Sequence, residues 1–170
     1  MILKRLKPIL KKIDPVSIIL LIVVITVFVW RAAPPGIEAM GSIRVRSLEG
    51  AEIDIEREPR RRVIVFWATW CGPCTVELTR LQMLINRGLI DPSAVLAISS
   101  HEERDVVDRT AREKQYTFQI ALDPSGETAA KVGVRGTPTI FLVEPDGSIH
   151  WGTVGVSPTL EIRVAKFLNL

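Results

Sequence analysis

The sequence predicts an α/β domain with a central β-sheet of mixed direction flanked by helices. Residues 63–68 (VIVFWA) form a continuous apolar run of β-branched and aromatic side chains, which is typical of a strand buried on both faces. Further along the chain, short apolar runs alternate with stretches of helical periodicity, the pattern of parallel strands joined by helices. The last two predicted strands flank the turn sequence EPDG, so the sheet also contains antiparallel strands.

The first 33 residues predict an N-terminal transmembrane helix ahead of this domain. Residues 16–30 carry no charge, and if Arg31 turns its charge outward the helix extends to residue 33, about 27 Å against a hydrocarbon core of about 30 Å. The preceding segment is basic, with Lys4, Arg5, Lys7, Lys11 and Lys12. By the positive-inside rule, residues 1–15 form a cytoplasmic basic segment, residues 16–33 a signal-anchor in the lipid bilayer, and the remainder lies outside.

Two alternatives to the signal-anchor use the same residues. A cleaved signal peptide has a similar basic and apolar pattern, but Pro34 and Pro35 directly after residues 31–33 (RAA) make a poor cleavage site. A buried core helix would rarely be so uniformly apolar directly after a basic cluster. The pattern therefore favours an uncleaved anchor.

The folded domain is expected over residues 41–170, after a linker at residues 34–40 that contains proline and glycine. Alternating apolar residues at 43–55 predict an opening hairpin, and the charged stretch 57–62 predicts a loop. After the apolar strand, the pattern predicts a helix over 76–88, a strand at 94–98, a helix at 102–114, a strand at 118–122, a turn at 123–126, a helix at 127–132, hairpin strands at 139–143 and 149–154, and a helix at 159–168.

The composition excludes several classes of protein. Cys71 and Cys74 are the only cysteines, which excludes a disulfide-rich scaffold and a four-cysteine zinc site. A zinc site that combined them with His101 and His150 would need histidine spacings that the sequence lacks, so no metal site is expected. The net charge of +3 reflects the amino-terminal cluster, and we therefore expect no nucleic-acid binding.

Cys71 and Cys74 carry the chemistry that the sequence predicts. Two residues separate them at the junction of the predicted apolar strand and the following helix, which places Cys71 at the helix amino terminus. Unpaired amides and the helix dipole favour the thiolate there, and the thiolate is the attacking species in disulfide exchange. Cys71 is therefore the predicted exposed nucleophile and Cys74 the buried resolving thiol. A purely structural disulfide is the alternative, but it would close a loop too small to add much stability.

Two segments of the sequence resemble the signatures of the thioredoxin family. They are residues 65–74 (VFWATWCGPC) and residues 133–139 (GVRGTPT). The resemblance implies a thioredoxin-like fold, a cis peptide bond before Pro138, and backbone pairing between Thr137 and an extended substrate. The substrate-binding surface that it implies consists of Trp70, Gly72, Pro73, Thr137 and Pro138, whereas the neighbouring Trp67 is expected in the core.

Further residues are similar to those of the TlpA/ResA-like membrane-anchored extracytoplasmic thioredoxins, some of which serve cytochrome c maturation. Glu77 follows the second cysteine by three, and residues 121–126 (ALDPSG) and 144–147 (EPDG) flank the second signature. Cytoplasmic thioredoxins carry a buried aspartate where Val65 stands here. The resemblance implies that Glu77 fills this role by shifting thiol pKa values or relaying a proton; a solvated helix glutamate is the alternative. Thr79 stands where the subfamily often has proline, which leaves the bend of the helix open.

The function that these features imply is an extracytoplasmic thiol–disulfide oxidoreductase. The resemblance places it on the bacterial inner membrane as a single-pass protein with its domain in the periplasm or extracytoplasmic space. With no cofactor beyond the Cys71–Cys74 disulfide, it would reduce protein disulfides, such as those of an apocytochrome c or a metallochaperone, and a membrane thiol donor would recharge it. The alternatives are a disulfide-donating oxidant, a tethered module that binds or delivers copper through the same thiols, and a peroxidase, for which the sequence shows no peroxide-binding arrangement.

Overall fold

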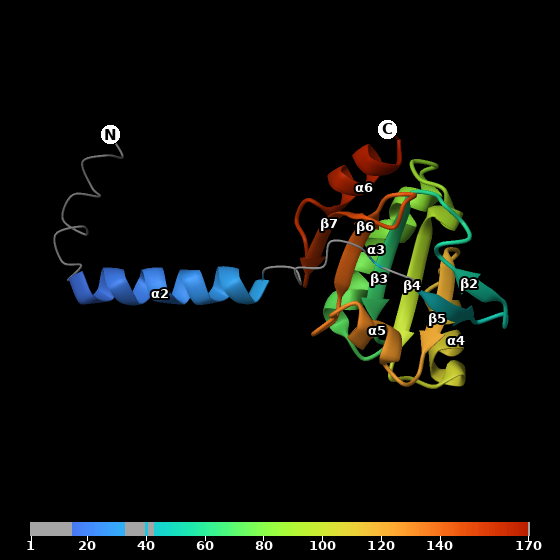
Figure 1. Ribbon diagram of the computed structural model, residues 1–170, viewed down its shortest axis with the longest axis horizontal. Helices are drawn as coiled ribbons and strands as arrows, with labels where there is room; N and C mark the ends of the chain where they lie inside the picture. Colours follow the sequence, from blue (N-terminus) through green and yellow to red (C-terminus); the bar gives the residue numbers. More distant parts are fainter. Residues whose placement is uncertain (1–14, 33–39, 41–42, 170) are drawn as a thin grey trace. The chain divides into compact units, whose positions relative to one another are not determined.

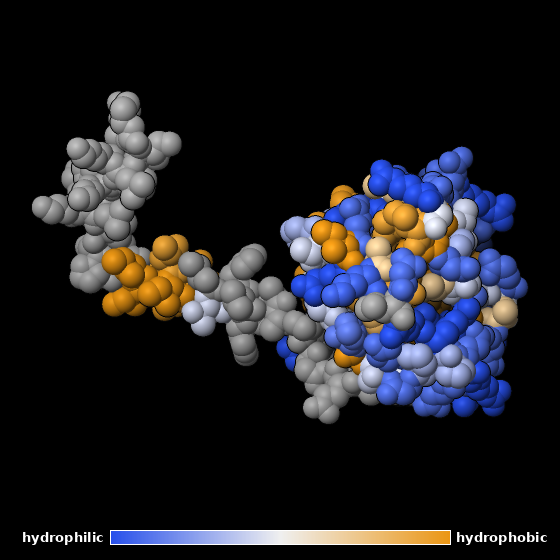
Figure 2. Space-filling view, turned by 90° about the horizontal axis from the view of Figure 1, so that it is seen from above, coloured by the Kyte–Doolittle hydropathy of each residue, from blue (hydrophilic) through white to orange (hydrophobic). Residues whose placement is uncertain are grey.

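The computed structural model describes residues 15–32, 40 and 43–169 (Figure 1). By internal contacts the chain divides into two compact units, residues 1–33 and 34–170. The first unit contains helix α2 (Pro15–Ala32), which is rich in Ile, Val and Leu, and most of its coloured atoms in Figure 2 are hydrophobic. Within the described residues, no helix has both the length and the hydropathy that crossing a membrane requires, so the transmembrane helix predicted over 16–33 is not confirmed. The cytoplasmic segment predicted before it lies almost entirely outside the described residues.

The second unit is built on a seven-stranded sheet of mixed direction, counted over the described residues. Its strands are β1 (Arg44–Ser47), β2 (Glu52–Asp54), β3 (Arg62–Trp67), β4 (Val95–Ser100), β5 (Gln119–Asp123), β6 (Thr139–Val143) and β7 (Ile149–Val154). They lie in the order β2-β1-β5-β4-β3-β6-β7. β3, β4 and β5 run parallel, whereas the β1–β2 hairpin and the β6–β7 hairpin join antiparallel at the two sides. The predicted α/β class with a mixed sheet is confirmed.

β3 lies in the interior of this sheet, and all six of its residues are buried. It pairs with β4 in parallel and with β6 in antiparallel register. Because successive side chains of a strand point to opposite faces, β3 contributes to two hydrophobic clusters. Val63, Val65 and Trp67 enter one cluster, and Ile64 and Phe66 enter the other. Burial on both faces explains why this strand is apolar without alternation.

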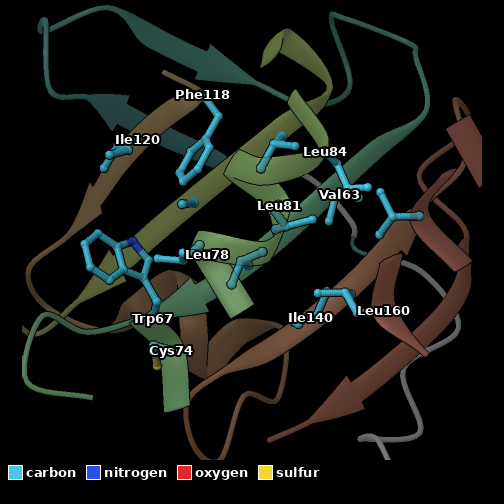
Figure 3. Packing of buried hydrophobic residues seen from close by; sticks show 14 of the residues in the cluster. Val63, Trp67, Cys74, Leu78, Leu81, Leu84, Phe118, Ile120, Ile140 and Leu160 are labelled. Carbon is cyan, nitrogen blue, oxygen red and sulfur yellow. The ribbon is translucent and has the colours of Figure 1, made fainter. Parts of the chain in front are cut away.

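Helices cover the two faces unequally. α3 (Gly72–Asn86), α4 (Arg104–Glu113) and α6 (Leu160–Leu168) all contribute side chains to the cluster that contains Trp67. Figure 3 shows the contributions of α3 and α6. α3 and α4 share that face because the β3-α3-β4 and β4-α4-β5 crossovers advance in the same direction across the sheet, and such connections are right-handed. α5 (Glu127–Lys131) contributes Ala129 to the other cluster and lies on the opposite face.

Three local features differ from the sequence expectation. Met40, the last residue of the predicted linker, is 2% exposed and its N–H donates to the Gly147 carbonyl at 2.9 Å, so the folded domain includes at least one residue before position 41. Arg62, expected in a loop, is the buried first residue of β3 and forms an ion pair with Glu58. A 3₁₀ helix, η1 (Pro92–Ala94), precedes β4; a three-residue element is too short to show hydrophobic periodicity.

Candidate active site at the start of α3

The turn between β3 and α3 carries both cysteines to one end of the sheet. β3 ends at Trp67, the N–H of Cys71 donates to the carbonyl of Ala68 at 3.2 Å, and α3 begins at Gly72. Cys71 is the N-cap residue of α3 and has an extended backbone conformation. Pro73 occupies the first helical turn, where its missing N–H removes no intrahelical hydrogen bond. Strand, turn and helix therefore hold Cys71 at the helix amino terminus.

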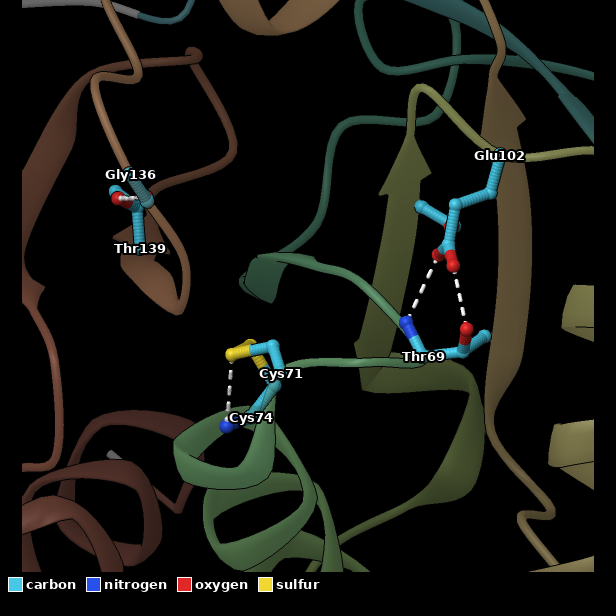
Figure 4. Close-up of a disulfide and its surroundings, with 7 residues drawn as sticks. Thr69, Cys71, Cys74, Glu102, Gly136 and Thr139 are labelled. Atoms are coloured by element: carbon cyan, nitrogen blue, oxygen red, sulfur yellow. Dashed lines mark hydrogen bonds between the residues drawn. A yellow bond between two sulfur atoms is a disulfide. The ribbon is translucent and has the colours of Figure 1, made fainter.

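Cys71 and Cys74 form a disulfide, and their Cα atoms are 5.2 Å apart. The Sγ atom of Cys71 also accepts a hydrogen bond from the backbone N–H of Cys74 at 3.2 Å (Figure 4). After reduction, the same N–H would stabilise a thiolate on Cys71, because a charged acceptor forms the stronger hydrogen bond.

The exposure of the two cysteines corrects one expectation. Cys74 is completely buried, as expected, but Cys71 is only 5% exposed. In this oxidised state Cys71 is not an exposed side chain, because its sulfur is bonded to Cys74 and lies against the first turn of α3. Cys71 is nevertheless the more exposed of the two cysteines, as expected if Cys71 is the nucleophile and Cys74 the resolving thiol.

An exposed rim surrounds the disulfide. Trp70 is 77% exposed, and Gly72 and Pro73 are exposed as well. Val76, in the next turn of α3, is 49% exposed. Exposed apolar side chains beside a disulfide suit a surface that contacts a partner protein. Trp67, by contrast, is 1% exposed and packs in the core.

The second signature meets the first at the end of β3. The peptide bond between Thr137 and Pro138 is cis, as the resemblance implies. Thr139, the first residue of β6, pairs with Phe66, which places the cis bond beside the strand end that leads to the cysteines. The Pro138 carbonyl accepts from the N–H of Gly155 at 2.7 Å. Within the described part of the chain, the backbone N–H and C=O of Thr137 make no hydrogen bond, so both are available to an extended peptide.

Glu77 lies on the buried side of α3 with 0% exposure, which excludes the alternative of a solvated helix glutamate. Its carboxylate accepts from the N–H of Ser157 at 2.6 Å and pairs with the Arg80 guanidinium at 3.3 Å. Burial raises the pKa of Glu77, and the hydrogen bond from Ser157 and the charge of Arg80 oppose that rise. Among the described residues, no hydrogen bond joins this carboxylate to either cysteine. A role for Glu77 in proton transfer stays a prediction.

Glu102 is a contact of the active-site turn that the sequence did not indicate. Its carboxylate accepts from the N–H of Thr69 at 2.9 Å and from the Thr69 hydroxyl (Figure 4). It also accepts from the Ser99 hydroxyl at 2.6 Å. The one available signal was its position two residues after β4, because polar residues beyond the carboxyl ends of parallel strands gather at the functional edge of an α/β sheet.

The described residues contain no arrangement of three or more His, Cys, Asp and Glu side chains that could hold a metal ion. The position at which cytoplasmic thioredoxins carry a buried aspartate is occupied here by Val65, which is completely buried in the core. Among the described residues, the groups placed for chemistry near the start of α3 are the two sulfurs, the amide of Cys74 and the backbone of Thr137, with the Glu77 carboxylate one helical turn further along.

Comparison with known proteins agrees with this geometry. A model of the AhpC/TSA family matches residues 42–151. The chain is 27% identical over 114 residues to the sporulation thiol–disulfide oxidoreductase A of Bacillus subtilis, a match that covers 65% of this chain and 69% of that protein. It is 30% identical over 168 residues to a thioredoxin-like protein of Haemophilus influenzae, with 96% of each chain covered. The match to the thiol–disulfide oxidoreductase ResA of Bacillus thuringiensis spans 61% of the length of that relative.

Among solved structures, the crystal structure of StoA from Bacillus subtilis superimposes with a TM-score of 0.60 at 24% identity, covering 79% of this chain and 98% of StoA. At this identity the likeness shows the fold, and that fold is the thioredoxin-like one which the two signatures imply. The chain therefore belongs to the AhpC/TSA family, and it is a thioredoxin-like thiol–disulfide oxidoreductase.

Proposed function

We propose that this chain is a protein-disulfide reductase that works outside the cytoplasm and transfers electrons from the Cys71–Cys74 dithiol to disulfides of other proteins. The observation that carries the proposal is the meeting of two features at the end of β3. A disulfide caps α3, and beside it a cis bond leaves the backbone of Thr137 unpaired within the described chain. One feature exchanges electrons, and the other can hold an extended peptide.

The reaction proceeds in two exchanges. The Cys71 thiolate attacks one sulfur of the substrate disulfide, and the other substrate sulfur leaves as a thiolate. Cys74 then loses its proton and attacks the Cys71 sulfur of the mixed disulfide, which releases the second substrate thiolate. The substrate gains two electrons, and the Cys71–Cys74 disulfide forms. The Cys74 amide supports the first step because it donates to the Cys71 sulfur.

The intervening residues support reduction rather than oxidation as the direction of transfer. Gly72 and Pro73 are the pair found in reducing thioredoxins, whose potential is about −270 mV. Strong oxidants of this kind have a very acidic first cysteine, and their potential is near −120 mV. We therefore propose substrates whose cysteines must be kept reduced in an oxidising compartment, such as an apocytochrome c or a metallochaperone. Because such a compartment has no access to cytosolic thiols, a membrane thiol donor is needed to return electrons.

The proposed location rests on the amino-terminal sequence. A basic segment followed by an uncharged apolar run supports anchorage of residues 16–33 in the bacterial inner membrane, with the domain on the extracytoplasmic side. Fractionation of cells that express the full chain tests this location. Recovery in the membrane fraction, with the domain accessible to protease added from outside, is the expected result. Recovery in the cytosolic fraction would contradict it.

The reduction potential of the dithiol tests the direction of electron flow. The domain can be equilibrated with dithiothreitol and glutathione buffers and its thiols trapped by alkylation. A potential below about −230 mV, more reducing than the glutaredoxin range, is expected for a reductant. A value above about −150 mV would instead make the protein a disulfide donor.

Replacement of the resolving thiol separates catalysis from metal delivery. In Cys74→Ser, the mixed disulfide with substrate cannot be resolved, so covalent adducts through Cys71 should accumulate and disappear on treatment with dithiothreitol. Cys71→Ser is the matched control and should form no such adducts, because it lacks the nucleophile. A copper-delivery module would give no adducts in either variant and would lose Cu(I) affinity in both.

A further inference from the structure

Glu102 connects the end of β4 to the turn that carries the dithiol. Ser99, in β4, pairs with Trp67, the last residue of β3, so the ends of the two strands lie side by side. The Glu102 carboxylate accepts from the hydroxyl of Ser99 at 2.6 Å on one strand and from Thr69 on the turn that follows the other. Three donors from two segments thus meet on one half-buried side chain.

The backbone bends at His101, and this bend brings Glu102 to the turn between β3 and α3. His101 has a φ of 62°, a left-handed conformation that is uncommon for residues other than glycine. Its N–H donates to the carbonyl of Asp123 at 3.0 Å. Its imidazole lies against Gly126, where an added Cβ would come within 2.0 Å of the ring. The turn after β5 therefore supports the conformation that returns Glu102 toward Thr69.

Thr69 stands two residues before Cys71 and one before Trp70. It lies between a fully packed strand and an exposed rim. Outside the helices and strand ladders of the described residues, one backbone hydrogen bond closes this turn, from the N–H of Cys71 to the carbonyl of Ala68. A turn with so few backbone hydrogen bonds needs side-chain contacts to hold it in a single conformation. The Glu102 carboxylate accepts hydrogen bonds from both the amide and the hydroxyl of Thr69. It therefore restrains the backbone two residues before Cys71.

We propose that Glu102 is a positioning residue for the dithiol: it anchors Thr69 to the end of β4 and thereby holds Cys71 and Trp70 in the geometry that substrate attack requires. Misplacement of a reacting group by about 1 Å can reduce a rate by orders of magnitude. The rate part of this inference rests on the proposed function, whereas its effect on the conformation of the turn does not.

Four variants of the full chain test the inference. Glu102→Ala removes the acceptor, Glu102→Gln keeps one acceptor oxygen, and Thr69→Val removes one donor with little change of shape. Glu103→Ala is the matched control, because Glu103 is an exposed neighbour whose side chain makes no capping hydrogen bond. For each variant, two quantities are measured: the second-order rate constant for reduction of a protein disulfide by the reduced enzyme, and hydrogen exchange of amides in residues 68–71.

We expect Glu102→Ala to lower the rate constant and to loosen the backbone of the turn alone. Glu102→Ala should reduce the rate constant by about tenfold and accelerate exchange within residues 68–71 by about tenfold, with little change in β3 or α3. Glu102→Gln should recover part of both, and Glu103→Ala should match the wild type. Because Glu102 is proposed to act through Thr69, adding Thr69→Val to Glu102→Ala should cause no further loss.

Three results would overturn the inference. Exchange in residues 68–71 could remain as slow in Glu102→Ala as in Glu103→Ala. Exchange could instead accelerate equally throughout β3 and α3, which would indicate general destabilisation. The losses from Thr69→Val and Glu102→Ala could also multiply, which would show that they act independently. If the wild type itself reduced no disulfide, the proposed function would fail, but the exchange measurements would still decide whether Glu102 holds the turn.

Discussion

Glu77 is fully buried on α3, one helical turn after Cys74. Removal from water disfavours its charged form, and for this reason its pKa is raised above the ordinary value of 4.5. The hydrogen bond from Ser157 and the ion pair with Arg80 offset part of that cost. A raised pKa brings this carboxyl group closer to the pKa of a thiol, which keeps the predicted relay role open to test.

Replacement of Glu77 by Gln should change the pH dependence of stability. Because its pKa is higher in the folded state, the folded chain binds more protons than the unfolded chain between the two pKa values. The contribution of Glu77 to the free energy of unfolding is therefore largest below the unfolded pKa and declines as pH rises through the folded one. Urea titrations from about pH 4 to about pH 7 should show a shallower decline in Glu77→Gln than in the wild type.

Glu103→Gln supplies the matched control for this measurement, because it makes the same chemical change at an exposed glutamate. Identical pH profiles for Glu77→Gln and the wild type would contradict the prediction. A role in proton relay has a separate readout, the pH profile of the rate at which Cys74 resolves a mixed disulfide. That profile should shift in Glu77→Gln if the carboxyl group accepts the Cys74 proton.

At the scale of elements, α3 both supports the dithiol and fills the core. Its buried residues are Cys74, Glu77, Leu78, Leu81, Gln82 and Leu84. The leucines at positions 78, 81 and 84 pack against side chains of the sheet in the cluster that also contains Trp67 (Figure 3). The helix is continuous from Gly72 to Asn86, so having Thr79 in place of the subfamily's proline does not interrupt it.

Truncation of Leu81 should destabilise the domain by a cavity effect. Leu81 is completely buried, so Leu81→Ala should reduce the free energy of unfolding by about 2–5 kcal/mol. Met83, two residues later on the same helix, is 41% exposed, and Met83→Ala should change it by no more than about 0.5 kcal/mol. Urea unfolding measures both values. Equal losses for the two variants would show that α3 is not packed as described.

Element positions were largely predictable, because each depends on short-range pattern. The apolar run at residues 63–68 became a strand with all its residues buried, and the EPDG turn joins β6 to β7. The strand order was less accessible, since it depends on which strands share hydrogen bonds across the sheet. β5, for example, lies between β1 and β4, and β1 precedes it by more than 70 positions in the sequence.

For the molecule as a whole, the division into two compact units predicts that the unit of residues 34–170 folds without residues 1–33. The unit of residues 34–170 contains all seven described strands and both hydrophobic clusters. A fragment of residues 34–170 should therefore fold alone, with a thermal midpoint and a Cys71–Cys74 potential equal to those of the full chain within error. Calorimetry and thiol-trapping titrations on both proteins measure this. A large decrease of the midpoint in the fragment would show that residues 1–33 stabilise the domain.

The reactive groups of this protein could be predicted from short segments of the sequence, whereas the hydrogen-bond partners of Glu77 and Glu102 could not. Cysteine spacing at a strand–helix junction was sufficient for the dithiol and the helix cap, because both depend on neighbours in the sequence. The cis bond was expected from the resemblance of residues 133–139 to the second thioredoxin signature. Glu77 bonds to a residue 80 positions away, and Glu102 bonds to one 33 positions back. Such partners are decided by packing, because the direction of a buried polar side chain depends on which distant donors the folded chain brings within hydrogen-bonding distance.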